Sequence, residues 1–309
     1  MAERMKALKW ARKCARGVRD VSAINWIVTS IARPLVRRDP PEWLIQHLPR
    51  RGRVTCEIPG ICTVDLWSRG DDYITSRLWW KGIQGYEPEM IMPFARFAQV
   101  CSVVLDIGAF TGLYSLIAAR ANPTCQVIAF EPHPLIGERL RHNIGLNQGI
   151  RVDVIPYAVC SSSGTRQFHL GGPGLPSSSS IADAWDGRYS TINVEAIDVD
   201  TFVEMSGLDR VDLVKIDVEA AEEEVLAGME ITLTSYRPVL FLEVLPGNAD
   251  RKIAETLRSQ EYRLFRLAST GPIREEDFES ADEARGYDER NHIACPVEKV
   301  PDWLLTMSG

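Results

Sequence analysis

Residues 103–112 read VVLDIGAFTG, and residues 127–132 read VIAFEP. The first segment is an apolar run that ends near Asp106 and passes into a glycine-containing loop, and the following stretch, LYSLIAARA, is compatible with a helix. The second segment is another apolar run, and it ends at Glu131. A strand, a glycine loop, a helix and a second strand closing on a carboxylate predict a nucleotide-binding βαβ half. An ordinary βαβ crossover with a glycine turn is the alternative interpretation.

The sequence pattern of the loop predicts which nucleotide-containing cofactor is bound. It reads D-x-G-x-x-x-G from Asp106 through Gly108 to Gly112, whereas a dinucleotide-binding loop has its first glycine where Asp106 stands. An acid at that place repels a pyrophosphate and suits a cation. S-adenosylmethionine carries a sulfonium and an α-ammonium, and it has a ribose whose hydroxyls Glu131 can accept. The loop therefore predicts S-adenosylmethionine as the cofactor.

Composition indicates a soluble globular protein. The 309 residues are 45% hydrophobic and 25% charged. Seven cysteines, an odd number without any C-x-x-C, favour neither a disulfide framework nor a zinc site, so we expect a cytoplasmic location. The first residues lack the pattern of a signal peptide, and the longest apolar candidate, residues 21–36, contains too many polar residues for a membrane span.

The charge is unevenly distributed along the chain. Residues 1–53 hold 13 Lys or Arg and 4 Asp or Glu, whereas the remainder holds 22 and 38. The acidic body excludes a nucleic-acid binder. Residues 3–19 can form a basic helix with a thin apolar face. We expect it to pack on the domain with a solvated basic side; peripheral contact with a membrane surface or an acidic partner is the alternative.

The chain divides into three parts. We predict a basic helical extension with a proline-rich linker at residues 1–53, a hairpin and helix cap at residues 54–100, and a catalytic domain at residues 101–309. The segments RVTCEIP and CTVDLWS form the expected hairpin, and Asp71 is the expected cap of the next helix. In the third part, near-continuous apolar runs alternate with helical segments, which predicts a mostly parallel sheet with helices on both faces. One run, VDVIPYAV, is expected to be a single strand, and residues 171–180 a loop.

Carboxylates also end the later strands. Asp217 and Glu219 follow the strand VDLVKI, and Glu243 ends the strand PVLFLE, so all three should lie at the ligand-binding edge of the sheet. Such acids can orient a hydroxyl and take up its proton, or hold a divalent cation such as Mg²⁺, with Asp217 and Glu243 as candidate ligands. Lys215, within the strand, should neutralise a nearby acid. The structural alternatives are a first-turn helix acid for Glu219 and a salt bridge for Glu243.

Three polar residues near the second strand have weaker signals. His133 is expected to face solvent in a loop, with adenosine or substrate contact as the alternative. Asn143 and Asn147 share one helix face; Asn143 is expected to reach the cofactor side and Asn147 to cap the helix. No histidine has metal-ligand spacing, and no Ser-His-Asp arrangement can be assembled from the sequence.

These segments together resemble the FkbM-type methyltransferases, in the family's order and at comparable spacing over residues 54–297. The matching segments are GYEPEM (85–90), VVLDIGAFTGLYSL (103–116), VIAFEPHP (127–134), HNIGLN (142–147), KIDVEAAEEEVLAG (215–228), PVLFLEV (238–244) and NHIACP (291–296). The resemblance implies a Rossmann-like class I methyltransferase fold, S-adenosylmethionine as donor, and transfer to an oxygen, typically a hydroxyl of a sugar, a polyketide or another natural product.

The resemblance also assigns residues. Asp217 and Glu219 match the family's acids after the fourth strand, but Ala220 stands where the family usually has glycine. Alanine fits a helix start there unless the backbone needs a positive φ. For the donor site we expect Tyr86, Glu87, Asp106, Gly108, Ala109, Phe110, Gly112, Glu131, Pro132, Asn143 and Ala158.

The sequence thus predicts an S-adenosylmethionine-dependent O-methyltransferase acting on a hydroxyl of a small-molecule acceptor. Asp217 is the first choice for activating that hydroxyl, with Glu219 and Glu243 as supporting acids or metal ligands. A rival is an NAD(P)-dependent oxidoreductase on a similar core, which would need a glycine at position 106 and a hydride-transfer partner. A non-catalytic scaffold that binds S-adenosylmethionine is the other alternative.

Overall fold

The computed structural model divides the chain into two compact units, which follow different boundaries from the three parts predicted above; that division stays a prediction. The first unit contains Met1–Glu57 and Asp65–Tyr86, and the second contains Ile58–Val64 and Glu87–Gly309. The expected basic helix at 3–19 and the expected loop at 171–180 lie outside the described residues. The structure describes residues 22–36, 40–170, 181, 190–244, 248–267, 274–275 and 290–306.

The first unit is built from short helices and a hairpin. Its helices are α2 (Ser22–Leu35), α3 (Glu42–His47), α4 (Tyr73–Lys81) and the 3₁₀ turn η1 (Gly82–Gly85). Strands β1 (Arg51–Ile58) and β2 (Cys62–Arg69) pair as the predicted hairpin, whose tip is grouped with the second unit. The predicted cap of α4 was wrong by one residue. Because α4 begins at Tyr73, Asp72 is its N-cap, and its carboxylate accepts from the backbone N–H groups of Ile74 and Thr75.

The second unit contains an eight-stranded sheet in the order β12-β11-β13-β10-β9-β3-β4-β5. The neighbouring strands β10, β9, β3, β4 and β5 are parallel, and β13 runs antiparallel to both β10 and β11. The mostly parallel sheet confirms the predicted α/β class. Its strands are β3 (Val103–Ile107), β4 (Gln126–Phe130), β5 (Val152–Ile155), β9 (Leu213–Ile216), β10 (Val239–Glu243), β11 (Tyr262–Leu267), β12 (Arg274–Glu275) and β13 (Asn291–Pro296).

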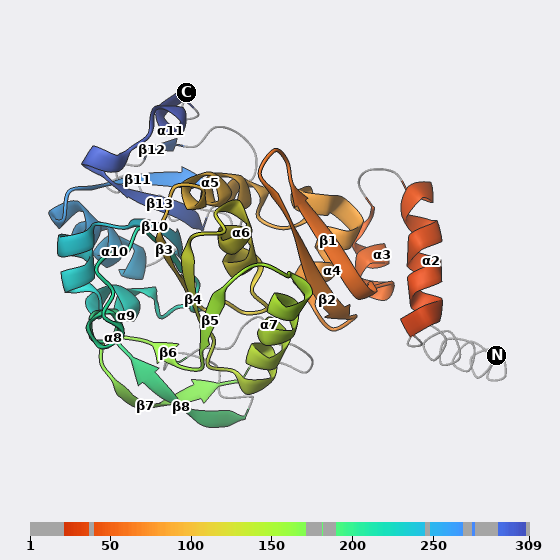
Figure 1. Ribbon diagram of the computed structural model, residues 1–309, viewed down its shortest axis with the longest axis horizontal. Coiled ribbons are helices and arrows are strands. Elements are labelled where there is room, and N and C mark those ends of the chain that lie inside the picture. Colours follow the sequence, from red (N-terminus) through yellow and green to blue (C-terminus); the bar gives the residue numbers. More distant parts are fainter. Residues whose placement is uncertain are drawn as a thin grey trace. The chain divides into compact units, whose positions relative to one another are not determined.

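Helices cover both faces of this sheet, as predicted (Figure 1). On one face Leu105 and Leu242 share a buried cluster with Val225 of α9 and Leu257 of α10. On the other face Phe241 meets Phe94 of α5, with ring centroids 5.3 Å apart. The helices are α5 (Pro88–Ala98), α6 (Leu113–Ala121), α7 (Pro134–Leu146), α8 (Val199–Ser206), α9 (Glu222–Ala227), α10 (Asn248–Ser259) and α11 (Asp302–Thr306), with π-helical η2 (Thr232–Tyr236) and 3₁₀ η5 (Val297–Lys299).

The two-residue period of the strands decides where the charged residues of the sheet lie. Leu105 and Ile216 belong to the cluster under α8, α9 and α10, so Asp106 and Lys215 point to the face covered by α5 and α6. These two residues are partners in the β3–β9 register. The alternation therefore brings an acid and a base together inside the sheet, next to the ends of the strands.

A second, three-stranded sheet has the order β6-β8-β7, with β6 at Ala158–Val159, β7 at Gly164–His169 and β8 at Thr191–Ile197. The expected single strand VDVIPYAV was wrong: it is split between β5 of the large sheet and β6 of the small one. Pro156 lies at the break, where it cannot donate a ladder hydrogen bond. Within the described ranges, no helix is both long and apolar enough to cross a membrane.

Candidate functional site

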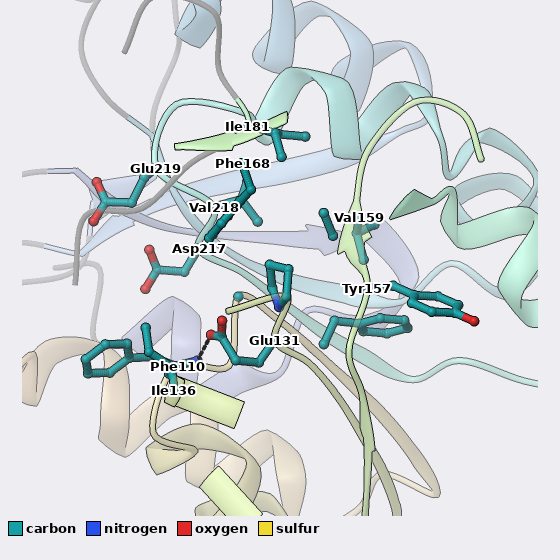
Figure 2. A pocket seen from close by; sticks show the side chains of 14 residues that line it. Phe110, Glu131, Ile136, Tyr157, Val159, Phe168, Ile181, Asp217, Val218 and Glu219 are labelled. Carbon is teal, nitrogen blue, oxygen red and sulfur yellow. Dashed lines mark hydrogen bonds between the residues drawn. The ribbon is translucent and has the colours of Figure 1, made fainter. Parts of the chain in front are cut away.

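A pocket opens beyond the carboxyl ends of β3, β4 and β9, within the second unit. The space inside it is about 540 Å³, including the part that reaches solvent. Figure 2 shows Asp217 and Glu219 on one side of it, Tyr157 and Val159 on the other, and Glu131 between them. Its lining residues are Gly108, Phe110, Phe130, Glu131, Pro132, Ile136, Tyr157, Ala158, Val159, Phe168, Ile181, Asp217, Val218 and Glu219.

The glycine loop is tied to the neighbouring strand. The N–H groups of Gly108 and Ala109 donate to the carbonyl of Phe130 at 3.1 and 2.9 Å. Gly108 has φ +78° and Gly112, the N-cap of α6, has φ +91°, so both have the left-handed backbone that favours glycine. Gly108 lines the pocket, whereas Ala109 and Gly112 are not among its lining residues. Ala109 and Gly112 therefore contribute to the conformation of the loop but not to the pocket wall.

Glu131 is held in one orientation by its backbone neighbours. Its Oε2 accepts from the Phe110 N–H at 2.9 Å, and its Oε1 accepts from the His133 N–H at 2.8 Å (Figure 2). Burial raises the pKa of this carboxyl to about 8, although both hydrogen bonds act against the rise. Each oxygen keeps a second lone pair. Glu131 can therefore accept two hydroxyl groups of a ligand without reorienting.

His133 does not face solvent, so that expectation was wrong. The side chain is buried at the N-cap of α7, and its Nδ1 accepts from the Leu135 N–H at 3.2 Å. The ring takes the place of the usual Ser or Asp cap, and burial lowers its pKa. The residue therefore belongs to the helix start that follows Glu131.

The two asparagines of α7 act on the backbone. Asn143 is fully buried, and its Nδ2 donates to the carbonyl of Thr111 in the glycine loop at 2.8 Å. Asn147 is the C-cap of the helix, as predicted, and donates to the carbonyl of Asn143 at 2.7 Å. Neither lines the pocket. Asn143 therefore holds the glycine loop against helix α7.

Lys215 is paired with an acid, as predicted. The side chain is only 1% exposed, and its Nζ lies 2.9 Å from Asp217 Oδ2 and 4.8 Å from the centre of the Tyr114 ring. The hydroxyl of Tyr114 donates to Glu87 Oε2 at 2.7 Å. Burial favours neutral Lys215, but the charges of Asp217, Glu87 and Glu243 outweigh it and raise its pKa. One ammonium group thus holds several carboxylates together.

Asp217 stays ionised in this setting, whereas Glu243 does not. Burial alone would raise the pKa of Asp217, but the Lys215 ammonium and a hydrogen bond from Glu243 lower it. Burial and the charge of Asp217 raise the pKa of Glu243 to about 10. Glu243 also lies 2.7 Å from Nη1 of Arg290. At neutral pH this pair therefore shares one proton, which Glu243 carries.

The same contacts bear on the predicted metal site. Asp217 and Glu243 already have Lys215 and Arg290 as cationic neighbours, and a protonated carboxyl is a poor metal ligand. Among the residues that the structure describes, no group of three or more His, Cys, Asp or Glu side chains could hold a metal ion. The donor set therefore does not fit a divalent cation, and the magnesium site stays an untested prediction.

Three other predicted donor-site residues do not line the pocket. Asp106 is 1% exposed, and the Ser115 hydroxyl donates to its Oδ2 at 2.5 Å, so the carboxylate lies between β3 and α6. Glu87, the N-cap of α5, has φ +39° and contacts Tyr114. Tyr86 falls in the first unit and is half-buried. Pro132, Phe110 and Ala158, by contrast, do line the pocket.

The turn after Asp217 has an unusual backbone. Glu219 and Ala220 have φ values of +53° and +73°, both left-handed. The expected helix start at Ala220 was wrong, because α9 begins at Glu222 with Ala221 as its N-cap. Glu219 is therefore not a first-turn acid of α9, whereas Glu222, Glu223 and Glu224 are. Oε1 of Glu222 accepts from the Ala220 N–H at 3.2 Å. Ala220 keeps the backbone shape for which glycine is suited.

Glu219 faces the pocket instead of the helix. Burial, with the charge of Asp217, raises the pKa of its carboxyl to about 7. A carboxyl that titrates near neutrality can accept a proton from a ligand and release it again. Glu219 is thus chemically different from Asp217, although the two acids are separated by one residue.

Much of the apolar wall was not foreseen from the sequence. Tyr157 lies beside β6, Phe168 is in β7, and Ile181 comes from between β7 and β8. None belongs to a recognisable motif. The VDVIPYAV run was a signal for Tyr157, because it follows a strand of the sheet, but no local pattern indicated Phe168 or Ile181. Phe130, Ile136, Val159 and Val218 complete the wall.

Several methyltransferases have similar sequences. Methyltransferase sdnD of Sordaria araneosa is 30% identical over an alignment of 156 residues, and the match covers 41% of this chain and 60% of sdnD. The 2-O-methyltransferase NoeI of Sinorhizobium fredii is 29% identical over 148 residues, 44% of this chain and 60% of NoeI. Hexuronic acid methyltransferase AglP of Haloferax volcanii is 31% identical over 198 residues, 62% of this chain and 75% of AglP. The chain spans about three fifths of the length of sdnD and of NoeI.

A solved structure of a Methyltransferase FkbM from Methylobacillus flagellatus shares 14% sequence identity and a TM-score of 0.42, covering 72% of this chain and 55% of that one. The family model described as the Methyltransferase FkbM domain matches residues 106–264, about half of the chain. This matched range contains the glycine loop, Glu131, Asp217, Glu219 and Glu243. The chain therefore belongs to the FkbM methyltransferase family.

Proposed function

We propose that the protein is an S-adenosylmethionine-dependent O-methyltransferase that acts on a hydroxyl group of a small-molecule acceptor. One observation carries the proposal. The described pocket wall presents three acidic side chains, Glu131, Asp217 and Glu219, of which Asp217 is ionised, and no Lys or Arg. Such a wall attracts a sulfonium and an ammonium and repels a pyrophosphate. It therefore favours this donor over a nicotinamide dinucleotide.

The residues present fit the donor. Glu131 can accept the two ribose hydroxyls, because its oxygens are already oriented by backbone N–H groups. Phe130, Ile136 and Phe168 provide apolar surface for a purine ring. Asp217 would face the cationic end. When bound, S-adenosylmethionine supplies a methyl group on a sulfonium, which is a good leaving group.

The acids divide the work on the acceptor. Asp217 is ionised and fixed by Lys215, so it can accept a hydrogen bond from the acceptor hydroxyl and align its oxygen. Its lowered pKa makes it a weak base. Glu219, with a pKa of about 7, is the better proton acceptor. We therefore assign alignment to Asp217 and proton uptake to Glu219, with protonated Glu243 holding Asp217 in place.

The relatives guide the choice of acceptor. NoeI is named a 2-O-methyltransferase and AglP a hexuronic acid methyltransferase, so we propose sugar hydroxyls as the first acceptors to test. Five cysteines in the described part of the chain, Cys62, Cys101, Cys125, Cys160 and Cys295, are free thiols. On that ground we propose a reducing, cytoplasmic setting.

Isothermal calorimetry with S-adenosylmethionine and with NAD⁺, followed by labelled methyl transfer to a panel of sugars, tests the proposal. We expect donor binding, no NAD⁺ binding, and transfer to at least one hydroxyl. Glu131→Gln should weaken donor binding by about tenfold, since the amide has one acceptor oxygen where an ionised carboxyl group has two. The matched control Glu138→Gln, in exposed α7 surface, should bind normally. Binding of NAD⁺ alone would overturn the proposal. Binding of S-adenosylmethionine without transfer to any acceptor would favour a non-catalytic scaffold over an enzyme.

A further inference from the structure

Helix α2 has its apolar side exposed and its polar side buried. Asn25 and Thr29 are both 0% exposed. The large apolar side chains of the same helix are instead open to solvent. Their exposed fractions are 37% for Ile24, 50% for Ile27, 42% for Val28, 59% for Ile31 and 79% for Leu35. This arrangement is the reverse of an ordinary surface helix, whose apolar stripe faces the core.

Specific hydrogen bonds hold the polar side of α2 against the first unit. The amide of Asn25 donates to the carbonyl of Pro49 at 2.9 Å and accepts from the Arg51 N–H at 2.8 Å. Arg50 Nη1 donates to the Thr29 hydroxyl at 2.7 Å. These contacts satisfy polar groups that would be costly to bury alone. The helix therefore cannot turn its apolar side inward without breaking them.

The exposed side chains form a continuous stripe. Positions 24, 27, 28, 31 and 35 recur at three- and four-residue spacing, so they lie on one helix face. Trp26 and Trp43, in α2 and α3, are also exposed, at 53% and 63%. Tryptophan is enriched where a protein meets the boundary between water and lipid. A stripe of this kind on one protein surface marks a place where something else binds.

The charge of the surrounding sequence indicates what binds. The first 38 residues hold ten Lys or Arg and two Asp or Glu, although the whole chain has a net charge of −7. Basic residues next to an amphipathic helix are the pattern of proteins that lie on anionic bilayers. The 14 residues of α2 are too few to span the roughly 20-residue thickness of a bilayer. The helix is therefore suited to lie in the plane of the surface.

We propose that α2 docks the protein on an anionic phospholipid surface. The stripe of Ile24, Ile27, Val28, Ile31 and Leu35 enters the boundary between headgroups and acyl chains, and the net positive charge of the first 38 residues favours an anionic surface. This inference goes beyond the proposed methyl transfer and does not depend on it.

Flotation of the full chain with vesicles tests the proposal, using phosphatidylcholine with one quarter phosphatidylglycerol and phosphatidylcholine alone. We expect flotation with the anionic vesicles, at least tenfold less with the neutral ones, and a strong decrease at 0.5 M salt. Ile27→Glu with Ile31→Glu should abolish flotation. The matched control, Val100→Glu with Met205→Glu, adds the same two charges at side chains 81% and 77% exposed outside α2 and should float normally.

Thermal unfolding of both double variants checks that they remain folded, which is expected because all four positions are exposed. Failure of the intact chain to float with anionic vesicles would overturn the proposal, as would equal flotation of all three proteins. Light scattering tests the other occupant, a second copy of the chain. A dimer of the intact chain that the Ile27→Glu, Ile31→Glu variant cannot form would assign the stripe to self-association and also overturn the lipid surface.

Discussion

Gly108 and Asp217 pack backbone against backbone at the bottom of the pocket: a Cβ atom on Gly108 would lie 1.9 Å from the carbonyl oxygen of Asp217. The glycine loop after β3 and the acidic turn after β9 can meet only because no side chain stands between them. This contact adds to the hydrogen bond that the Asp217 N–H donates to the carbonyl of Ile107 at 3.0 Å.

Gly108→Ala should destabilise the protein by at least about 3 kcal/mol, because the left-handed φ of +78° costs about 1–2 kcal/mol for a residue with a Cβ and the clash with a backbone oxygen adds to it. Gly149→Ala is the matched control. Gly149 has φ +80°, and no atom lies within 4 Å of the Cβ that alanine would add. Only the cost of the left-handed backbone conformation should therefore remain. Urea unfolding measures both, and equal losses would contradict the role of the Asp217 contact.

Ala220→Gly should stabilise the protein by about 0.5–1 kcal/mol. Alanine is strained at φ +73°, and relief of that strain exceeds the extra entropy that glycine brings to the unfolded chain. Ala121→Gly, at the last residue of α6, should have the opposite sign, since glycine disfavours a helix. Thermal unfolding of the two variants gives the comparison. Loss of stability in Ala220→Gly would mean that the left-handed turn is not strained.

Lys215→Met should cost about 3–5 kcal/mol, because it removes the buried cation that pairs with ionised Asp217. The double variant Lys215→Met with Asp217→Asn should recover part of that loss, since one uncompensated charge is removed with it. Urea unfolding at neutral pH measures the cycle. Additive losses in the double variant would show that the two groups are not coupled.

Stability should decrease as the pH rises from about 4.5 to 7. Burial raises the pKa of Glu222 from 4.5 to about 7, so within that window the folded protein keeps a proton that the unfolded chain has released. Folding then becomes less favourable with rising pH. Glu222→Gln should flatten this decrease by about 1–3 kcal/mol, whereas Glu224→Gln, exposed in the same turn, should leave it unchanged. Unfolding series at several pH values decide between these outcomes.

The rate of methyl transfer should rise with pH through about 7 and then level off, if Glu219 takes up the acceptor proton. Glu219→Gln should lower kcat by about 10²–10⁴-fold and remove this rise. Asp217→Asn should lower kcat but keep the rise, because the proton acceptor is still present. A Glu219→Gln profile that still rises through pH 7 would assign the titration to another group.

The sequence predicted the parts of the site that depend on chain-local patterns. Apolar runs that end in acids located β3, β4, β9 and β10, and the common edge of parallel strands brought Glu131, Asp217 and Glu219 into one pocket. The pairing of Lys215 followed from its place within a buried strand. In each case one physical rule, the direction of a strand or the cost of a buried charge, sufficed.

The remaining features depend on partners far away in the chain. Phe168 and Ile181 reach the pocket wall only because the small sheet folds beside the large one. The direction of α2 depends on Arg50 and Arg51, which bind its polar side. The surrounding turn imposes the left-handed backbone of Ala220, and an alanine in the sequence does not predict this conformation.

Four residues without the freedom of glycine have left-handed backbones near the carboxylates: Glu87, Phe110, Glu219 and Ala220. Such conformations are unfavourable in an isolated peptide, and the folded chain around them maintains them. These four residues therefore adopt their left-handed conformations when the polypeptide folds. The cost of these left-handed conformations therefore lowers the stability of the fold. It does not lower the affinity for a ligand, because binding does not have to create these conformations.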